Sequence, residues 1–127
     1  MKTATNHIIS SVLLIDDDEL ILNAISELLE ADGYQLHTAN GGAESITKIS
    51  NGLHPDIVIA DYHMRNKNGV EVVKSIRQLL GEEVAAIIFT DDTTDEAREA
   101  ARQNKCIVLR KPHDVETLSN NISKMSA

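Results

Sequence analysis

Aromatic residues, cysteine and long hydrophobic runs are all scarce in this sequence. Its 127 residues include no tryptophan, one phenylalanine and two tyrosines, so the core must be built from aliphatic side chains. The single cysteine, Cys106, cannot form a disulfide within the chain, which fits a reducing compartment. No apolar run approaches the about 20 residues that a membrane helix needs, and the first residues contain no signal-peptide core. These absences predict a cytoplasmic domain without membrane contact.

Basic residues are also few, with 12 lysines and arginines against 20 aspartates and glutamates, for a net charge of −8. An acidic domain without a basic stripe repels the phosphates of nucleic acids, so we expect no nucleic-acid partner. Hydrophobic residues make up 42% of the chain, enough for one core, and no repeat or Pro/Gly linker divides it. The sequence predicts a flexible leader over residues 1–10 and a single domain over residues 11–127.

Short, solid apolar runs alternate with helical patterns along the chain. The solid runs are rich in β-branched residues, as buried parallel strands are. They lie at residues 12–15, 57–60, 84–89 and 107–109, and a weaker alternating run at 34–39 predicts an edge strand. Apolar residues at helical spacing predict a helix after each strand. These helices are marked by Leu22 to Leu29, Ala43 to Ile49, Val70 to Leu80, Thr94 to Gln103 and Val115 to Met125.

Strands that alternate with helices predict an α/β fold with a doubly wound, five-stranded parallel sheet, because parallel strands need right-handed crossover connections. With residues 34–39 at an edge, the expected strand order is 2-1-3-4-5, as in flavodoxin-like (βα)5 folds. Ligands of such sheets bind beyond the carboxyl ends of the strands, between the first and third strands where the order reverses.

Polar side chains stand at the carboxyl end of each central strand. Asp16 and Asp17 follow the first strand, Asp61 the third, Thr90 ends the fourth, and Lys111 follows the fifth. Two carboxylates about 4 Å apart repel by roughly 4 kcal/mol at an effective dielectric of about 20. The three aspartates therefore need either raised pKa values or a cation, and Mg²⁺, which prefers oxygen ligands, fits them.

Mg²⁺, a lysine, a hydroxyl and a carboxylate together suit phosphoryl transfer, in which catalysis is mainly positioning and charge neutralisation. An aspartate can itself be the attacking group, which gives an acyl phosphate. Asp16 and Asp17 could instead cap the following helix, but Asp61 and Lys111 at matching strand ends favour a functional site. We interpret Asp18 as the helix cap.

The acidic pair, the aspartate, the threonine and the Lys-Pro that follow these strands resemble the receiver domain of two-component response regulators. The resemblance extends from Val12 to about Met125. It implies a switch that accepts a phosphoryl group from a histidine kinase or a phosphotransfer protein and then acts on an unknown downstream protein. It also implies a monomer or weak dimer whose only catalysis is its own phosphorylation and dephosphorylation.

The resemblance implies a role for each site residue. Asp61 is the expected phosphoacceptor, Thr90 the donor to a phosphoryl oxygen, and Lys111 the partner of the acyl phosphate. The implied magnesium ligands are Asp17, Asp61 and the backbone carbonyl of His63, with Asp16 in the outer shell. The Lys-Pro bond is often cis in this family, so Lys111–Pro112 is a candidate cis bond.

The sequence departs from the family pattern at several positions. Arg65 stands where proline is usual, Asn68 where aspartate usually precedes Gly69, and Asp91 where a small residue usually follows the threonine. Asp91 adds negative charge beside the site, so we expect slow or donor-selective phosphorylation. Val108 replaces an aromatic residue that normally couples to the threonine, which makes the chain more similar to receivers fused to hybrid histidine kinases.

Two alternative functions stay open. A degenerate receiver would act as an interaction module without phosphorylation, which the departures at Arg65, Asp91 and Val108 allow. A haloacid-dehalogenase-type phosphatase would use Asp16 as its nucleophile, although Leu20 stands where that motif has threonine or valine. The residue that becomes labelled, Asp16 or Asp61, distinguishes such an enzyme from a receiver.

Two hypotheses concern the surroundings of Asp61. We expect His63 and Asp92 to tune the attack of water on the acyl phosphate. The helix at 94–103 has only alanines on its apolar face and buries little area, so it is either merely marginal or moves when Asp61 is modified. Cys106 precedes a buried strand, and we interpret it as a small core residue.

Overall fold

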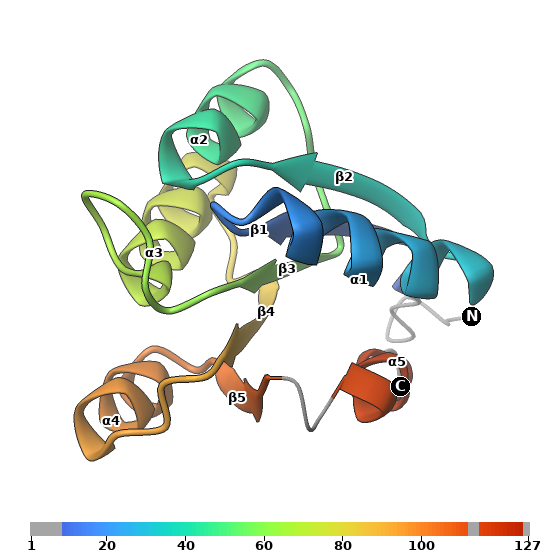
Figure 1. Ribbon diagram of the computed structural model, residues 1–127. Helices are drawn as coiled ribbons and strands as arrows, with labels where there is room; N and C mark the ends of the chain where they lie inside the picture. Colours follow the sequence, from blue (N-terminus) through green and yellow to red (C-terminus); the bar gives the residue numbers. More distant parts are fainter. Residues whose placement is uncertain (1–8, 112–114, 126–127) are drawn as a thin grey trace, which may run out of the picture.

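The computed structural model describes residues 9–111 and 115–125, which form one parallel sheet covered by helices on both faces (Figure 1). Its strands are β1 (Ser11–Ile15), β2 (Gln35–Ala39), β3 (Ile57–Ala60), β4 (Ala85–Thr90) and β5 (Ile107–Arg110). All neighbouring strands pair in parallel, in the order β2-β1-β3-β4-β5. The predicted doubly wound α/β fold and its strand order are therefore confirmed.

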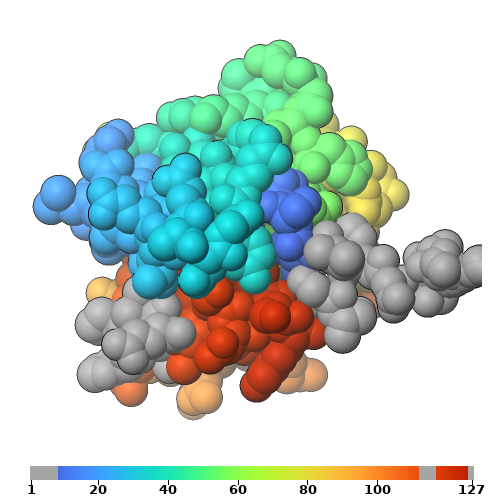
Figure 2. Space-filling model, turned by 90° about the vertical axis from the view of Figure 1, so that its right-hand side faces the viewer, coloured from blue at the N-terminus to red at the C-terminus, as the bar shows by residue number. Residues whose placement is uncertain are grey.

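The helices follow the strands as predicted and divide between the two faces. They are α1 (Glu19–Ala31), α2 (Gly42–Ser50), α3 (Gly69–Leu80), α4 (Asp95–Gln103) and α5 (Val115–Met125). In Figure 1, α1 and α5 cover one face of the sheet, and α2, α3 and α4 cover the other. Figure 2 looks onto the first face, where α1 and α5 lie next to each other. None of the described helices has the length and apolar character that a membrane crossing requires.

Aliphatic side chains fill both layers between the sheet and the helices. Side chains of a strand point alternately to opposite faces, so Leu13 and Ile15 of β1 pack toward α2 and α3, whereas Val12 and Leu14 pack toward α1 and α5. All four are buried. Burying one such side chain contributes about 1.5–3 kcal/mol, so this core holds in place the strand whose end carries the acidic pair.

Local signals in the sequence set the ends of the helices nearest the site. Asp18 caps α1 by accepting a hydrogen bond from the Leu20 backbone N–H, as we interpreted it. Asn68 and Glu71 form a capping box at the start of α3. Gly81 ends α3 with a φ of 73°, a left-handed conformation that glycine adopts without strain. The capping box holds the first turn of α3 beside the end of β3.

The packed domain begins earlier than predicted. Ile9, which we assigned to the leader, is only 4% exposed and packs in the core beneath α1 and α5. The Ser10 backbone N–H and hydroxyl both donate to Asp56, at 2.9 and 3.1 Å. Ile9 is therefore held in the domain by burial of its aliphatic side chain, and Ser10 by its hydrogen bonds to a carboxylate. The rest of the predicted leader, residues 1–8, and the candidate cis bond before Pro112 lie outside the described residues.

The edge formed by β5 and α4 is the least buried part of the sheet. The sequence predicted β5 as a buried strand, but Ile107 is 40% exposed and Val108 is half-buried. The reason is topological, since β5 has a neighbour on only one side. Beside it, α4 buries only Ala97 and Ala101, which confirms the alanine face expected from the sequence.

Candidate functional site

The carboxyl ends of the central strands bring the predicted site residues to one edge of the sheet. The pairing of β1 with β3 runs to Ile15 and Ala60, and Asp61 continues it by donating its backbone N–H to the Ile15 carbonyl at 3.1 Å. On the other side, the Lys111 backbone N–H donates to the Thr90 carbonyl at 2.9 Å. Residues far apart in the sequence therefore meet at the predicted position.

Lys111 bridges two of the predicted carboxylates. Its Nζ lies 2.5 Å from Oδ2 of Asp16 and 3.3 Å from Oδ2 of Asp61. The side chains of Asp16, Asp61 and Lys111 are only 4%, 14% and 12% exposed. Charges with so little solvent around them interact much more strongly than surface charges do. One ammonium thus offsets part of the repulsion that the sequence predicted between these carboxylates.

Burial and pairing shift the titration of this group in opposite ways. Burial raises the pKa of Asp16 above its ordinary value, although the hydrogen bond from Lys111 acts to lower it. For Lys111, burial acts to lower the pKa, but the hydrogen bond to Asp16 and the charge of Asp61 raise it above its ordinary value overall. Lys111 therefore stays an ammonium at neutral pH and faces more than one carboxylate.

Two carboxylates at the site, those of Asp61 and Asp17, have oxygen atoms that are available to bind a ligand. Oδ1 of Asp61 is buried and forms no hydrogen bond within the described residues. The half-buried carboxylate of Asp17 likewise forms no hydrogen bond or ion pair with residues 9–111 and 115–125. A buried oxygen without a partner marks a place for an ion or a reacting group. These oxygens are hard donors, so their chemistry fits Mg²⁺.

The carboxylates do not already form a closed ligand cluster. Among the residues that the structure describes, no group of three His, Cys, Asp or Glu side chains stands ready to hold a metal ion. One reason is visible in the contacts, because Oδ2 of Asp16 and Oδ2 of Asp61 both accept from Lys111. The magnesium ligands implied by the resemblance, including the His63 carbonyl, remain predictions.

Thr90 is fully buried at the end of β4. Its Oγ1 accepts a hydrogen bond from the Asp92 backbone N–H at 3.1 Å, which leaves the hydroxyl hydrogen to donate. Oδ1 of Asp92 in turn accepts from the backbone N–H of Thr94, the N-cap of α4, at 2.9 Å. A chain of hydrogen bonds therefore runs from the hydroxyl at the site to the start of α4.

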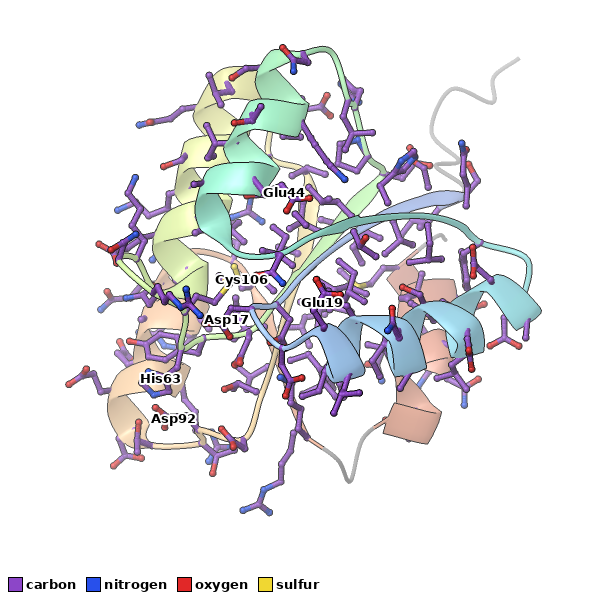
Figure 3. All side chains as sticks on the ribbon, turned by 45° about the horizontal axis from the view of Figure 1, so that its top comes forward. Asp17, Glu19, Glu44, His63, Asp92 and Cys106 are labelled. Carbon is purple, nitrogen blue, oxygen red and sulfur yellow. The ribbon has the colours of Figure 1, made fainter. Side chains whose placement is uncertain are left out.

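His63 and Asp92 form a contact between two loops at the outer side of the site. Nε2 of His63 lies against Oδ2 of Asp92, and the His63 side chain remains 64% exposed (Figure 3). The ring of Tyr62 packs against the imidazole from the core in a T-shaped contact, with 4.9 Å between the two ring centroids. Hydrogen bonds from Thr94, and then the contact with His63, lower the pKa of Asp92. The β3–α3 loop and the β4–α4 loop are thus joined.

Gly69 is a residue that sequence reasoning missed. A Cβ atom placed there would lie 2.1 Å from the Asp61 backbone oxygen, and the Gly69 N–H donates to the Tyr62 carbonyl at 2.8 Å. Only glycine lets α3 begin this close to Asp61, the predicted phosphoacceptor. We noted Asn68-Gly69 solely as a variant of a family pair. A glycine at the first position of a predicted helix was the signal that could have revealed it.

The surroundings of Cys106 and Val108 bear on two further predictions from the sequence. Cys106 is buried in the core, and burial raises the pKa of its thiol, in agreement with a small core residue rather than a reactive one. Val108 borders an open pocket of about 240 Å³ between the β4–α4 loop, α4 and β5. The side chain that replaces the usual aromatic therefore leaves space unfilled beside α4.

Comparisons with known proteins agree with this geometry. The sequence profile of the response regulator receiver domain matches residues 12–123. The transcriptional regulatory protein CpxR homolog of Haemophilus influenzae is 28% identical, over 87% of this chain and 56% of that protein. The two-component response regulator PprB of Pseudomonas aeruginosa is 27% identical, over 99% of this chain and 46% of that protein. The chain thus spans about half the length of these relatives.

Solved structures show the same architecture. The chemotaxis protein CheY4 of Vibrio cholerae has a TM-score of 0.83 and 26% identity, covering 94% of this chain and 99% of that chain. The response regulator TrrA of Thermotoga maritima, in complex with Mg²⁺ and BeF, has a TM-score of 0.78 and 25% identity, covering 91% and 98%. Since the family profile spans nearly the whole chain and the fold agrees, the chain belongs to the receiver domain family of two-component response regulators.

Proposed function

We propose that this domain is a cytoplasmic signalling switch that accepts a phosphoryl group on Asp61 from the phosphohistidine of a histidine kinase or a phosphotransfer protein. The observation that carries the proposal is the Asp61 carboxylate, whose Oδ2 accepts from Lys111 and whose buried Oδ1 has no partner among the described residues. A carboxylate oxygen that is positioned but unpaired can act as a nucleophile. In this family, that position is the phosphoacceptor.

The side chains around Asp61 have distinct tasks in the transfer. An oxygen of Asp61 forms the new O–P bond while the P–N bond to the donor imidazole breaks, and the imidazole nitrogen takes up a proton. Lys111 and the hydroxyl of Thr90 bind the phosphoryl oxygens through charge and hydrogen bonding. The residues that would hold Mg²⁺ are Asp16, Asp17, Asp61 and the His63 backbone carbonyl. When bound, Mg²⁺ supplies positive charge that offsets the negative charge of the phosphoryl group.

The output of the switch is a change of surface around α4 and β5, which a downstream protein then recognises. The hydrogen-bond chain from Thr90 through Asp92 to Thr94 supports this proposal, because a shift of the Thr90 hydroxyl toward a phosphoryl oxygen would disturb the first turn of α4. The small apolar contact of α4 supports it as well, since weakly docked elements move most easily. Val108 stands where an aromatic residue usually couples to the threonine. Since that coupling is absent here, the change of surface is carried by α4 itself.

Intact mass spectrometry tests the proposal. We expect the domain, incubated with Mg²⁺ and acetyl phosphate, to gain the mass of one phosphoryl group. The gain should be absent from the Asp61→Asn variant and from samples containing EDTA, because the first lacks the nucleophile and the second lacks the cation. A gain that persists in Asp61→Asn would point to Asp16, as in the phosphatase alternative. No gain under any condition, with a phosphohistidine donor included, would leave the degenerate interaction module.

A further inference from the structure

A second concave surface lies between α2, α3 and the loop that precedes α3. It is a pocket of about 370 Å³, within the range of about 300–1,000 Å³ that is typical of ligand sites. Its lining residues are Gly42, Ala43, Ile46, Arg65, Asn66, Lys67, Val72 and Ser75, and we name it the α2–α3 pocket. In Figure 1 the two helices lie next to each other, and the β3–α3 loop extends beside α3. Neither Asp61 nor Lys111 lines this pocket.

The inner part of the pocket is apolar and partly open to solvent. Ala43 is exposed and Ile46 is half-buried, whereas Val72 belongs to the core. Gly42 lets the two helices approach here, because a Cβ atom at this residue would lie 2.8 Å from Cγ2 of Val72. The result is an aliphatic surface that a single side chain of a partner could cover, with a favourable contribution from its burial.

The outer side of the pocket is cationic. Arg65 and Lys67 are both exposed, and neither forms an ion pair with a carboxylate in residues 9–111 and 115–125. Within the part of the chain that the structure describes, the Lys67 side chain makes a single, long hydrogen bond, 3.4 Å from Nζ to the Ser75 hydroxyl. By contrast, Lys48 and Lys105 pair with glutamates. Two cations without carboxylates, on a chain of net charge −8, form a local site that favours an anionic partner.

We propose that the α2–α3 pocket binds an acidic peptide segment of a partner protein. In this complex one aliphatic side chain of the segment packs on Ala43 and Ile46, and flanking carboxylates pair with Arg65 and Lys67. An aliphatic surface beside two cations selects a ligand that carries both an aliphatic side chain and carboxylates. A free anion lacks the first of these, and a purely apolar ligand lacks the second. The inference goes beyond the proposed switch and does not depend on phosphorylation of Asp61.

The test uses ¹⁵N-labelled domain and a defined probe, the acetylated and amidated hexapeptide Asp-Glu-Leu-Leu-Glu-Asp. We expect saturable NMR shifts centred on Ala43, Ile46, Arg65, Lys67 and Ser75. Two control peptides carry lysines in place of the acids or serines in place of the leucines. Each control peptide should bind at least about tenfold more weakly, because the first loses the pairing of its acids with the cations and the second loses the aliphatic contact. A tenfold change in Kd corresponds to about 1.4 kcal/mol of binding free energy.

Matched charge variants identify the contribution of the pocket. Arg65→Glu combined with Lys67→Glu should weaken binding at least about tenfold, because the flanking carboxylates are then repelled. Lys74→Glu combined with Lys124→Glu makes the same change in net charge on exposed residues outside the pocket, and binding should stay nearly unchanged. The NMR spectrum of each variant also shows whether it remains folded.

Three results would overturn the proposal. Equal weakening in the two double variants would mean that binding responds only to overall charge. Shifts of the same residues that depend on protein concentration, without peptide, would identify a second copy of the chain as the occupant. The absence of saturable shifts at millimolar peptide would show that the pocket does not select this chemistry, because even a Kd of about 1 mM corresponds to only about 4 kcal/mol of binding free energy.

Discussion

Lys111 lies between two carboxylates, Asp16 and Asp61, that would otherwise repel each other. Its ammonium has little contact with water, so its charge is only weakly screened. The arrangement still leaves more negative than positive charge at this edge of the sheet, because Asp17 has no cationic partner among the described residues. At the scale of single residues, this uncompensated negative charge favours the binding of a cation, as the proposed function requires.

His63 and Asp92 are expected to control how long the acyl phosphate survives. Their contact joins two loops on the outer side of the site, so removing it should give water better access to phosphorylated Asp61. We expect His63→Ala and Asp92→Ala each to shorten the phosphorylated lifetime by at least about twofold, or about 0.4 kcal/mol in barrier height. Loss of the phosphorylated mass with time, after removal of the donor, provides the measurement.

A matched control for this prediction is His54→Ala. His54 also pairs with a carboxylate, that of Glu82 at 2.6 Å, but it lies on the loop before β3, at the opposite end of that strand from Asp61. Its substitution should leave the lifetime unchanged. Unchanged lifetimes for both His63→Ala and Asp92→Ala would contradict the assigned role.

At the scale of elements, the position of α3 against the end of β3 depends on one small residue. Replacing Gly69 with alanine should destabilise the domain by about 1–3 kcal/mol, because the new methyl group meets the rigid backbone of Asp61. The conformation of Gly69 itself is no obstacle, since its φ is not positive and alanine favours helices. Urea unfolding of the two proteins measures the difference in the free energy of unfolding.

Gly42→Ala is the matched control, since Gly42 also begins a helix and also has a close neighbour. There the neighbour is the Val72 side-chain terminus at 2.8 Å, which can move, so the loss should be clearly smaller. Equal losses for both glycines would show that the backbone contact at Asp61 is not what makes Gly69 necessary.

Helix α4 should open more easily than α3. It buries only Ala97 and Ala101, whereas α3 buries residues along most of its length. Less buried apolar area means a smaller free energy of local opening. Native-state hydrogen exchange should therefore show the amides of α4 exchanging earlier than those of α3. Comparable protection in both helices would speak against a mobile α4 as the output of the switch.

At the scale of the whole molecule, excess acidic charge gathers where the strands end, and a divalent cation should stabilise the fold. A ligand that binds only the folded state at ten times its Kd adds about 1.4 kcal/mol of stability. We expect Mg²⁺ to raise Tm by a few degrees in thermal unfolding and EDTA to reverse the effect. Asp17→Asn should greatly reduce this shift, because it removes a predicted ligand.

Asp32→Asn is the control for the magnesium prediction. It changes the net charge by the same amount at an exposed position following α1, far along that helix from Asp17. The magnesium-dependent rise in Tm should be unaffected by it. An identical rise in Asp17→Asn and in the parent protein would place the cation elsewhere.

The elements, their order in the sheet and the set of residues at the strand ends all followed from local patterns. Solid apolar runs define the strands, although β5 at the sheet edge is less buried than its run predicted. Parallel strands necessarily carry their carboxyl-terminal residues to a common edge. Pairings between distant residues could not be predicted in the same way. Lys111 and Asp16 are 95 positions apart, and His63 and Asp92 are 29 apart, so their contacts exist only once the sheet has assembled. The same holds for the burial of Ile9 and for the close approach of Gly69 to Asp61, because both depend on how neighbouring elements pack rather than on nearby sequence.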